Sequence, residues 1–349
     1  LQAIATKVNN DAIALALPNP NYQPYLTEGY DINGIDVGFL VKAGKINVTS
    51  VIQYGKTAIY INPNTSLSET LFDRPPLAVM ATFTKPGCAT PIPFTIIINH
   101  LQSLGGIGDV TDGARVRAKR KAQAEFLANL IQGRQVADAA EKIISLGDYN
   151  AYQFNDGYVD VMGTIKGTPT PANQVVASSS DLVNPDLINL NDTYNSAQRY
   201  SYVFSGSALA LDHVLITQNI SGQVANFGIA RLGSDFPEIF YGDNLRPEGL
   251  TDHDVPVVYF NFTCPAPSFA SDYFRTKASG NWNSLATWES STDNVSWHAA
   301  TLTPNFNANT INILSGHVVT VTANVTVDQL FVNPGSSVIV NTAVVFTVL

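Results

Sequence analysis

The stretch IISLGDYN, residues 143–150, is the most informative part of the sequence. Its apolar half predicts a β-strand, and Gly147 ends that strand directly before Asp148, Tyr149 and Asn150. A strand end over a rigid sheet is a place where a fold can hold reactive groups in fixed positions. A single aspartate after a strand is also typical of a turn or cap, so this stretch needs support from the rest of the chain.

Three further segments share this design, in which an apolar strand runs into Asp, Asn or His. They are Ile98-Asn99-His100, Leu211-Asp212-His213 and Thr251-Asp252-His253-Asp254. Carboxylates with an Asn amide suit a hard cation such as Mg²⁺ or Ca²⁺. A histidine beside a carboxylate suits proton transfer near neutral pH. For His213 we favour a plain structural role at the end of its strand.

The first 263 residues alternate β-prone runs with few helical ones. Apolar residues at helical spacing predict a helix over about 113–133. Strands are expected at 35–41, 78–83, 94–98, 143–146, 201–204, 212–217 and 255–262. Many strands with few helices between them predict an α+β fold of layered sheets, rather than a doubly wound parallel sheet.

The remainder of the chain differs in composition. The Pro-containing stretch Cys264-Pro265-Ala266-Pro267 is typical of a linker, so we predict domains at 1–263 and 264–349. Short strands bounded by Asn, Gly or Pro predict a small all-β domain, and their Asn, Val and Thr repetition is similar to the first coils of a β-solenoid. Its tryptophans fit a core better than a carbohydrate-binding platform; they are Trp282, Trp288 and Trp297.

Composition excludes several classes of protein. The net charge of −9, from 19 basic and 28 acidic residues, excludes a basic nucleic-acid coat protein. Hydrophobic residues make up 45% and charged residues 13%, which argues against disorder, and no apolar run is long enough to span a membrane. The weakly charged, Asn-, Thr-, Ser- and Gly-rich composition indicates a secreted protein. The cysteines, Cys88 and Cys264, form one disulfide or remain two free thiols, and both alternatives stay open.

The four polar segments, in this order along the chain, resemble the motifs of the endonuclease/exonuclease/phosphatase, or DNase I-like, superfamily. The similarity is greatest to its secreted bacterial nuclease branch, through the runs 148–158 and 200–213. It extends over residues 1–263. The resemblance implies a four-layer α/β sandwich, with two β-sheets flanked by helices. It also implies an enzyme that cleaves phosphate esters with a divalent metal, usually Mg²⁺, with Ca²⁺ or Mn²⁺ as alternatives.

The resemblance further implies catalytic roles for individual residues. His253 corresponds to the general base that activates a water, and Asp212 to the carboxylate that orients it. Asp148 and Asn150 correspond to the pair that positions the nucleophile and contacts the phosphate.

The same resemblance implies a second histidine and its surroundings. His100 corresponds to the histidine that stabilises charge on the phosphate or helps the leaving group, and Asp36 to its carboxylate partner. Asp36 also fits a solvated turn residue after Asn33-Gly34. Arg74 corresponds to a phosphate-contacting arginine, and Asp252 to a metal ligand.

Two residues of the family pattern have no counterpart in this sequence. The family's first strand carries an Asn and the segment after it a metal-binding Glu, and we expect the sequence to begin downstream of both. Loss of a metal's main carboxylate ligand can abolish turnover, so we expect activity to depend on the segment that carries it.

The sequence therefore predicts an extracellular, metal-dependent nuclease that acts on DNA. Two alternatives stay open: a phosphatase or lipid phosphodiesterase on the same scaffold, and a catalytically impaired binding or adhesive protein whose β-rich domain contacts a surface or glycan. A cluster of basic residues is either a patch that attracts phosphate or a solvated helix face. Its members are Arg115, Arg117, Lys119, Arg120, Lys121 and Arg134.

Overall fold

The structure consists of two units. It is a computed structural model that describes residues 1–349 except 89, 232, 241–242, 244, 247–250 and 265. The first unit comprises Leu1–Phe83 and Pro93–Thr263, and the second comprises Thr84–Ile92 and Cys264–Leu349. The second unit therefore includes a short segment, Thr84–Ile92, that interrupts the first unit in the sequence.

The first unit is built on a six-stranded sheet. In spatial order its strands are β3 (Ile46–Gln53), β6 (Leu77–Phe83), β7 (Ile92–His100), β8 (Ile143–Asp148), β12 (Asp212–Ile216) and β9 (Ile188–Asn189). The apolar residues of the inner strands are buried because layers cover the sheet; Ile97 and Leu215, for example, have no exposed surface.

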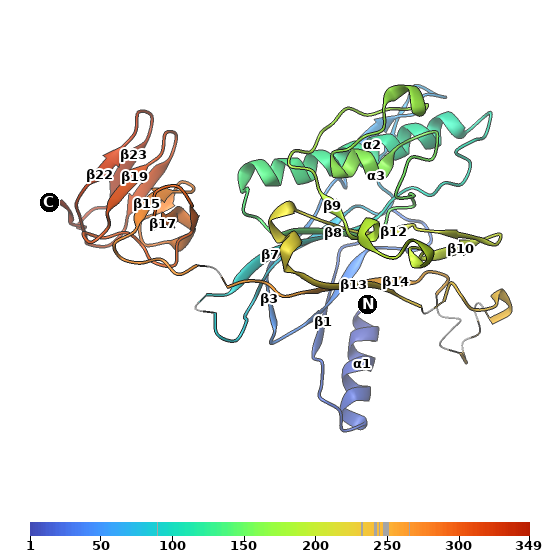
Figure 1. The fold of residues 1–349 in the computed structure, drawn as a ribbon, viewed down its shortest axis with the longest axis horizontal. Coiled ribbons are helices and arrows are strands. Elements are labelled where there is room, and N and C mark those ends of the chain that lie inside the picture. The colour runs from blue at the N-terminus through green and yellow to red at the C-terminus, as the bar shows by residue number, and fades with distance from the viewer. Residues whose placement is uncertain (89, 232, 241–242, 244, 247–250, 265) are drawn as a thin grey trace. The chain divides into compact units, whose positions relative to one another are not determined.

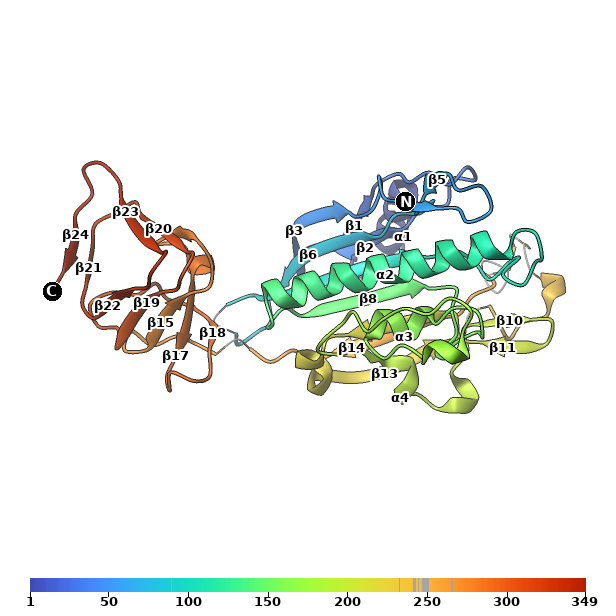
Figure 2. The same cartoon turned by 90° about the horizontal axis from the view of Figure 1, so that it is seen from above.

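Two helices, α2 (Gly113–Ala137) and α3 (Val161–Lys166), cover one face of this sheet (Figures 1 and 2). Leu127 and Ile131 of α2 and Met162 of α3 form one core cluster with Ile97 and Leu215 of the sheet. The helix expected from the apolar spacing is thus α2, which extends a turn beyond the expected end.

Two antiparallel pairs lie on the opposite face of the sheet from α2 (Figure 1). They are β1 (Tyr22–Leu26) with β2 (Gly38–Lys42), and β13 (Val224–Ala230) with β14 (Val255–Phe260). Helix α1 (Gln2–Ala14) lies outside them, and Asn9 anchors it, because its side chain accepts from the Tyr22 N–H at 2.8 Å and donates to the Tyr22 carbonyl at 3.0 Å. Helices outside two layers of β-structure confirm the α+β sandwich that the sequence predicted.

The remaining elements of the first unit are short. They are α4 (Leu190–Thr193) and two hairpins, β4 (Ile59–Ile61) with β5 (Ser68–Thr70) and β10 (Tyr202–Phe204) with β11 (Ser207–Leu209). Among the helices of the described residues, none combines the length and the apolar character needed to cross a bilayer.

The second unit is β-rich, as expected, and its strands pair mostly in parallel. They are β15 (Tyr273–Thr276), β16 (Gly280–Asn281), β17 (Trp288–Ser291), β18 (His298–Ala299), β19 (Thr310–Ile313), β20 (Val318–Val321), β21 (Val325–Val327), β22 (Leu330–Val332), β23 (Ser337–Val340) and β24 (Phe346–Val348). The pairs β19–β22, β20–β23 and β21–β24 are all parallel, so each turn of the chain stacks on the previous one, as the coils of a solenoid do.

The core of the second unit is apolar and aromatic. Trp282 and Trp288 are fully buried, with ring centroids 4.9 Å apart. Trp297 is half-buried under the Arg275 guanidinium, which lies 4.3 Å from its ring centroid. A disulfide joins Cys88 to Cys264 within this unit. Of the two alternatives for the cysteines, the structure therefore has the bonded pair.

Candidate active site

The pairing register of three neighbouring inner strands, β7, β8 and β12, brings polar groups together at one end of these strands. We call this end of the six-stranded sheet the site edge. Strands β7 and β8 run parallel, with His100 opposite Asp148. Strands β8 and β12 run antiparallel, with Asp212 opposite Asp148. Three of the polar segments singled out in the sequence therefore meet at one place.

Two residues of the LGDYN stretch have backbone conformations that shape this edge. Gly147 has a φ of +131°, and a Cβ there would lie 2.1 Å from the Asn99 carbonyl oxygen, so only glycine fits between β7 and β8. Asn150 has a φ of 47°, which asparagine tolerates. Its backbone N–H donates to Asp148 Oδ1 at 2.8 Å, and its side-chain Nδ2 donates to Asp148 Oδ2 at 3.1 Å. Asp148 is therefore held through both of its carboxylate oxygens.

His253 reaches the same edge from the segment that precedes β14. Its Nδ1 lies 2.7 Å from Asp212 Oδ2, and because a carboxylate only accepts, Nδ1 carries a proton. The fully buried Ser201 donates its hydroxyl to the same oxygen at 2.7 Å. The Tyr202 ring stacks on the imidazole with centroids 4.6 Å apart. These contacts fix the ring and leave Nε2 as the nitrogen that Asp212 does not engage.

His100 has a different partner. Arg74 Nη1 lies 2.9 Å from His100 Nε2, and because a guanidinium only donates, Nε2 must accept and the ring is neutral in this arrangement. His100 Nε2 also lies 3.4 Å from Asp148 Oδ2, and Arg74 Nε lies 3.9 Å from Asp31 Oδ2. The second histidine therefore sits between a cation and the carboxylate at the centre of the site.

The surroundings of His253 raise its proton affinity. Burial acts to lower its pKa, but the hydrogen bond and charge of Asp212, with the charges of Asp148 and Asp252, outweigh burial and raise the pKa of His253 to about 9. In the metal-free chain this imidazole therefore carries a positive charge at neutral pH.

The pKa values of His100 and Asp148 shift in the directions that burial predicts for a histidine and a carboxylate. Burial, then the charges of Arg74 and His253, lowers the pKa of His100 to about 4. Burial, then the charge of Asp212, raises the pKa of Asp148 to about 6. The site therefore pairs a charged histidine with a neutral one, on either side of a carboxylate that ionises reluctantly.

The residues present fit a divalent cation. Asp148, Asp212 and His253 each offer a ligand atom, and these atoms lie within 4.8 Å of one another. Carboxylate oxygens are ligands that hard cations prefer, and such an ion would relieve the repulsion by Asp212 that, after burial, raises the pKa of Asp148. A cation held by Asp148 and Asp212 would supply charge neutralisation at a bound phosphate.

Most of the site residues predicted from the sequence lie together. Those at the edge of the sheet are Arg74, His100, Asp148, Asn150, Asp212 and His253. Asp252, predicted as a metal ligand, lies apart from them. Its side chain is exposed and is not among the possible ligand atoms of the cluster, although its charge raises the pKa of His253. His213 is fully buried and hydrogen-bonded to the Ala151 carbonyl at 2.8 Å, which agrees with the structural role favoured for it.

The expected pairing of Asp36 with His100 is not found among the described residues. Asp36 Oδ1 instead accepts a hydrogen bond from the Gly29 backbone N–H at 2.6 Å. The carboxylate beside Arg74 is that of Asp31, and its charge acts on His100. Asp36 is half-buried and its carboxylate also hydrogen-bonds the Glu28 side chain, so it supports the segment at Glu28 and Gly29 and is not the solvated turn residue of the alternative.

The basic residues of α2 have partners within the fold. Arg120 is 1% exposed, and its Nη1 donates to the Asn150 carbonyl at 2.8 Å, so the helix supports the site through a buried cation. The others engage acidic side chains or carbonyls of the first unit: Arg115 with Asp112, Arg117 with Ile107, Lys119 with Asp73, Lys121 with Glu125 and Arg134 with Glu141. This cluster therefore stabilises the fold and is not a free cationic patch.

Three residues of the site were not identified from the sequence. Ser201 and Tyr202 hold His253 and Asp212, and Asp31 lies beside Arg74. The run Tyr200–Phe204 contributes to the family resemblance, but a serine next to a strand gives no local signal of the carboxylate that it contacts. Only the packing of β10 beside the segment before β14 reveals that contact.

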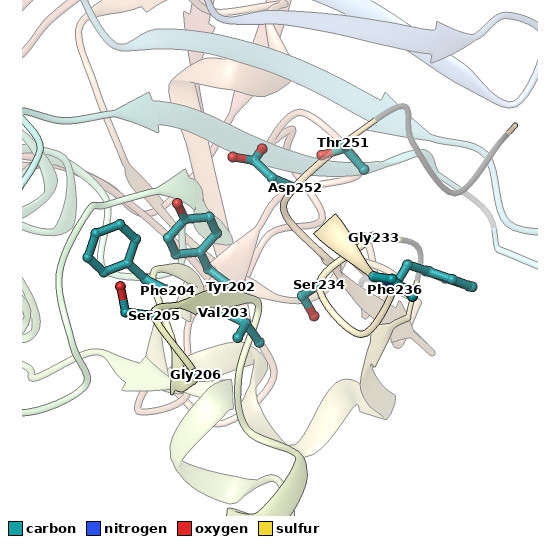
Figure 3. A pocket seen from close by; sticks show the side chains of 11 residues that line it. Tyr202, Val203, Phe204, Ser205, Gly206, Gly233, Ser234, Phe236, Thr251 and Asp252 are labelled. Atoms are coloured by element: carbon teal, nitrogen blue, oxygen red, sulfur yellow. The ribbon is translucent and has the colours of Figure 1, made fainter. Parts of the chain in front are cut away.

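A cavity of about 470 Å³ adjoins the site (Figure 3). Tyr202 lines it and also stacks on His253, so the cavity and the imidazole share a wall. The β10–β11 hairpin forms one side, and the loop with Ser234 and Phe236 forms the other (Figure 3). Asp254, fully buried, holds that loop, because its carboxylate accepts from the Gly233 N–H at 3.0 Å.

No family model and no curated protein matches the chain, but solved structures do. Mannosyl-6-phosphatase from Bacteroides thetaiotaomicron is 14% identical, with a TM-score of 0.40 over 74% of this chain and 90% of that one. ANGEL2, a 2′,3′-cyclic phosphatase in complex with adenosine-2′,3′-vanadate, is 15% identical, with a TM-score of 0.40 over 72% of this chain and 76% of that one.

An endonuclease/exonuclease/phosphatase family protein from Bacteroides thetaiotaomicron is 15% identical, with a TM-score of 0.35 over 64% of this chain and 69% of that one. Structures of the family that the sequence motifs resemble are thus among those to which the chain is similar. The identities and TM-scores are low, so the proposed function rests on the geometry of the site.

Proposed function

We propose that this protein is a metal-dependent phosphodiesterase that cleaves DNA outside the cell. The observation that supports this most is the edge of the sheet where His100 and Asp212 flank Asp148 and where Asp212 holds His253. One histidine that is protonated and one that is neutral lie beside two neighbouring carboxylates. Such a set of groups suits acid–base chemistry at an anionic centre better than a structural role.

The chain's own groups divide the work of hydrolysis. His253 is held through Nδ1, so its Nε2 is the atom that would take a proton from the water attacking phosphorus. That role requires the imidazole to be neutral, and neutralisation of the neighbouring carboxylates by Mg²⁺, with Ca²⁺ or Mn²⁺ as alternatives, would remove the charges that now raise its pKa. Arg74 and His100 lie where they would stabilise charge on the phosphate.

The choice of DNA and of an extracellular location rests on other observations. The motif order resembles the secreted nuclease branch, which is the reason for proposing DNA. The Cys88–Cys264 disulfide supports an oxidising compartment, because such bonds persist outside the cytosol. Mass spectrometry of the protein alkylated in the whole culture of its source cells should find both cysteines protected from alkylation before reduction. Alkylation of both without reduction would count against the location.

A plasmid-nicking assay with Mg²⁺ tests the activity. The full-length protein should convert supercoiled DNA to open-circular and linear forms, EDTA should stop the reaction, and His253→Ala should abolish it. His298→Ala, in the second unit, is the matched control and should cleave as the unaltered chain does. Absence of cleavage, or cleavage that survives His253→Ala, overturns the proposal. Rates of hydrolysis of phosphomonoesters and of lipid phosphodiesters, compared with the rate on DNA, distinguish a nuclease from a phosphatase or a lipid phosphodiesterase.

A further inference from the structure

The cavity beside His253 has an aromatic character that hydrolysis of a phosphate does not require. Tyr202 and Phe204 project from the same strand, with ring planes 15° apart and centroids separated by 6.4 Å. Phe236 lies on the opposite side of the cavity (Figure 3). Phe204 is 61% exposed and Phe236 is 40% exposed, so apolar rings face the solvent at both sides. Such faces are typical of a site for a planar group.

The array of rings begins at the reactive histidine. The imidazole of His253 stacks on Tyr202 with an interplanar angle of 29°, and Tyr202 stacks in turn on Phe204. A planar group bound along this array would therefore lie next to the ring that faces the scissile phosphate. Because Tyr202 both lines the cavity and stacks on His253, neighbouring groups of one substrate can contact the cavity and the imidazole.

The polar groups of the cavity argue against a second phosphate there. Among its described lining residues none is basic, and Asp252 contributes a negative charge at the rim. Ser205 also lines the cavity and offers a neutral hydroxyl. The volume of about 470 Å³ is within the range of about 300–1,000 Å³ of small-molecule sites. An uncharged, flat heterocycle with polar edges fits these walls better than a phosphate or a lipid chain.

We propose that this cavity holds one unstacked nucleobase of the substrate strand, adjacent to the phosphodiester that is cleaved. This inference rests on the proposed nuclease function and specifies its substrate. A base can enter the cavity only after it leaves its stack and its pairing partner, and this costs a few kcal/mol in a duplex and least in a single strand. The protein therefore prefers single-stranded DNA, and the rings of Phe204 and Phe236 stack on the captured base.

The test compares a single-stranded oligonucleotide with the same strand carrying abasic residues beside the cleaved linkage, and with its duplex. The full chain should have a kcat/KM about 5- to 100-fold higher on the strand with bases than on the abasic strand, as expected from the stacking of one base. Phe204→Ala and Phe236→Ala should bring this ratio towards one. Phe204→Trp keeps an aromatic ring and should keep the ratio high. Tyr259→Ala changes an exposed aromatic residue that does not line the cavity and should also leave the ratio unchanged.

The outcomes distinguish this inference from the proposed function. Cleavage of every substrate with equal kcat/KM on base-containing and abasic strands overturns the base site but leaves the nuclease intact. Faster cleavage of the duplex than of the single strand overturns it as well. Absence of any cleavage overturns the proposed function, and binding in EDTA then decides the base site. The fluorescence of a single strand that carries one 2-aminopurine should fall when the full-length protein binds, and should fall less with Phe204→Ala. An equal loss of fluorescence with both proteins overturns the inference.

Discussion

The site edge of the first unit and the stacked strands of the second are both made of short β-strands, but they bury different groups. At the site edge, Arg120 and His213 are fully buried and Asp148 is largely buried. In the second unit the core cluster around Trp282 and Trp288 is apolar, and the buried Asp272 accepts from the Phe269 N–H at 2.8 Å. Burial of charge costs stability unless partners compensate, whereas burial of aromatic surface stabilises. The difference indicates that the first region holds reactive groups at the expense of stability.

The two regions also differ in what their polar side chains hold. At the site edge, the hydroxyl of Ser201 and the imidazole of His253 both hold a carboxylate, that of Asp212. In the stacked strands, the buried tryptophans donate to backbone carbonyls, such as Trp288 to Trp282 at 2.7 Å. A change at the first region should therefore alter chemistry and proton affinity, and a change at the second should alter stability alone.

Asp212→Asn should give the largest effect and should be confined to the first region. The variant loses the charge that orients His253, so kcat should fall by about 10²–10⁴-fold. Plasmid cleavage at saturating DNA measures this loss. Asp192→Asn, which changes an aspartate that pairs with Lys166 at 3.1 Å, is the control and should keep full activity. Equal activity of Asp212→Asn and the unaltered chain would show that His253 does not depend on this carboxylate.

Trp288→Ala should give the largest effect in the second region. The indole is fully buried, so its removal should lower the free energy of unfolding of this unit by about 3–5 kcal/mol. All three tryptophans belong to this unit, so their fluorescence in urea reports its unfolding alone. Trp297→Ala, at a half-buried position, is the control and should cost less. Loss of DNA cleavage in folded Trp288→Ala would contradict the separation of the two regions.

The sequence predicts α2 and the inner strands of the six-stranded sheet, because these depend on local apolar patterns, but it does not predict β1, β3 or β13. Apolar runs that end in Asp, Asn or His identify β7 and β8 and place His100 and Asp148 at their ends, whereas Asp212 is the first residue of β12 and not the end of a strand. The register that puts His100 and Asp212 on either side of Asp148 is a property of strand pairing. It depends on contacts between distant segments, and no local pattern records it.

The failures have the same physical origin. Asp36 was paired with His100 by resemblance, but its carboxylate caps the Gly29 amide and Asp31 lies beside Arg74 instead. The basic residues of α2 resemble a patch in the sequence, but some of their acidic partners come from distant segments, such as Asp73 for Lys119. Others lie on the helix or at its start, such as Glu125 for Lys121 and Asp112 for Arg115.

Asp148→Asn should stabilise the first unit while it removes activity. The pKa of Asp148 is raised from 3.8 to about 6, so the carboxyl contributes stability that is fully present below about pH 3.8 and lost as the pH rises through about 6. The asparagine cannot ionise, so the variant should exceed the unaltered chain by about 1–3 kcal/mol at pH 8 and by much less at pH 4. Urea unfolding followed by helical circular dichroism measures the difference. A difference that does not change with pH would show that Asp148 ionises freely in the fold.

The proton affinities of the two site histidines should give the smallest but most direct contrast. In the metal-free chain, ring-proton NMR should show His253 titrating near pH 9 and His100 near pH 4. Because the pKa of His253 is raised, its protonation contributes stability that is complete below about pH 6.5 and is lost as the pH rises through about 9. Asp212→Asn removes the nearest charge and leaves only a neutral amide oxygen to accept from Nδ1, so the pKa of His253 should fall while the pKa of His100, which Arg74 holds neutral, remains low. If His253 kept its high pKa in that variant, the charges of Asp148 and Asp252 would be sufficient to hold the proton, and the site edge would be organised around Asp148 alone.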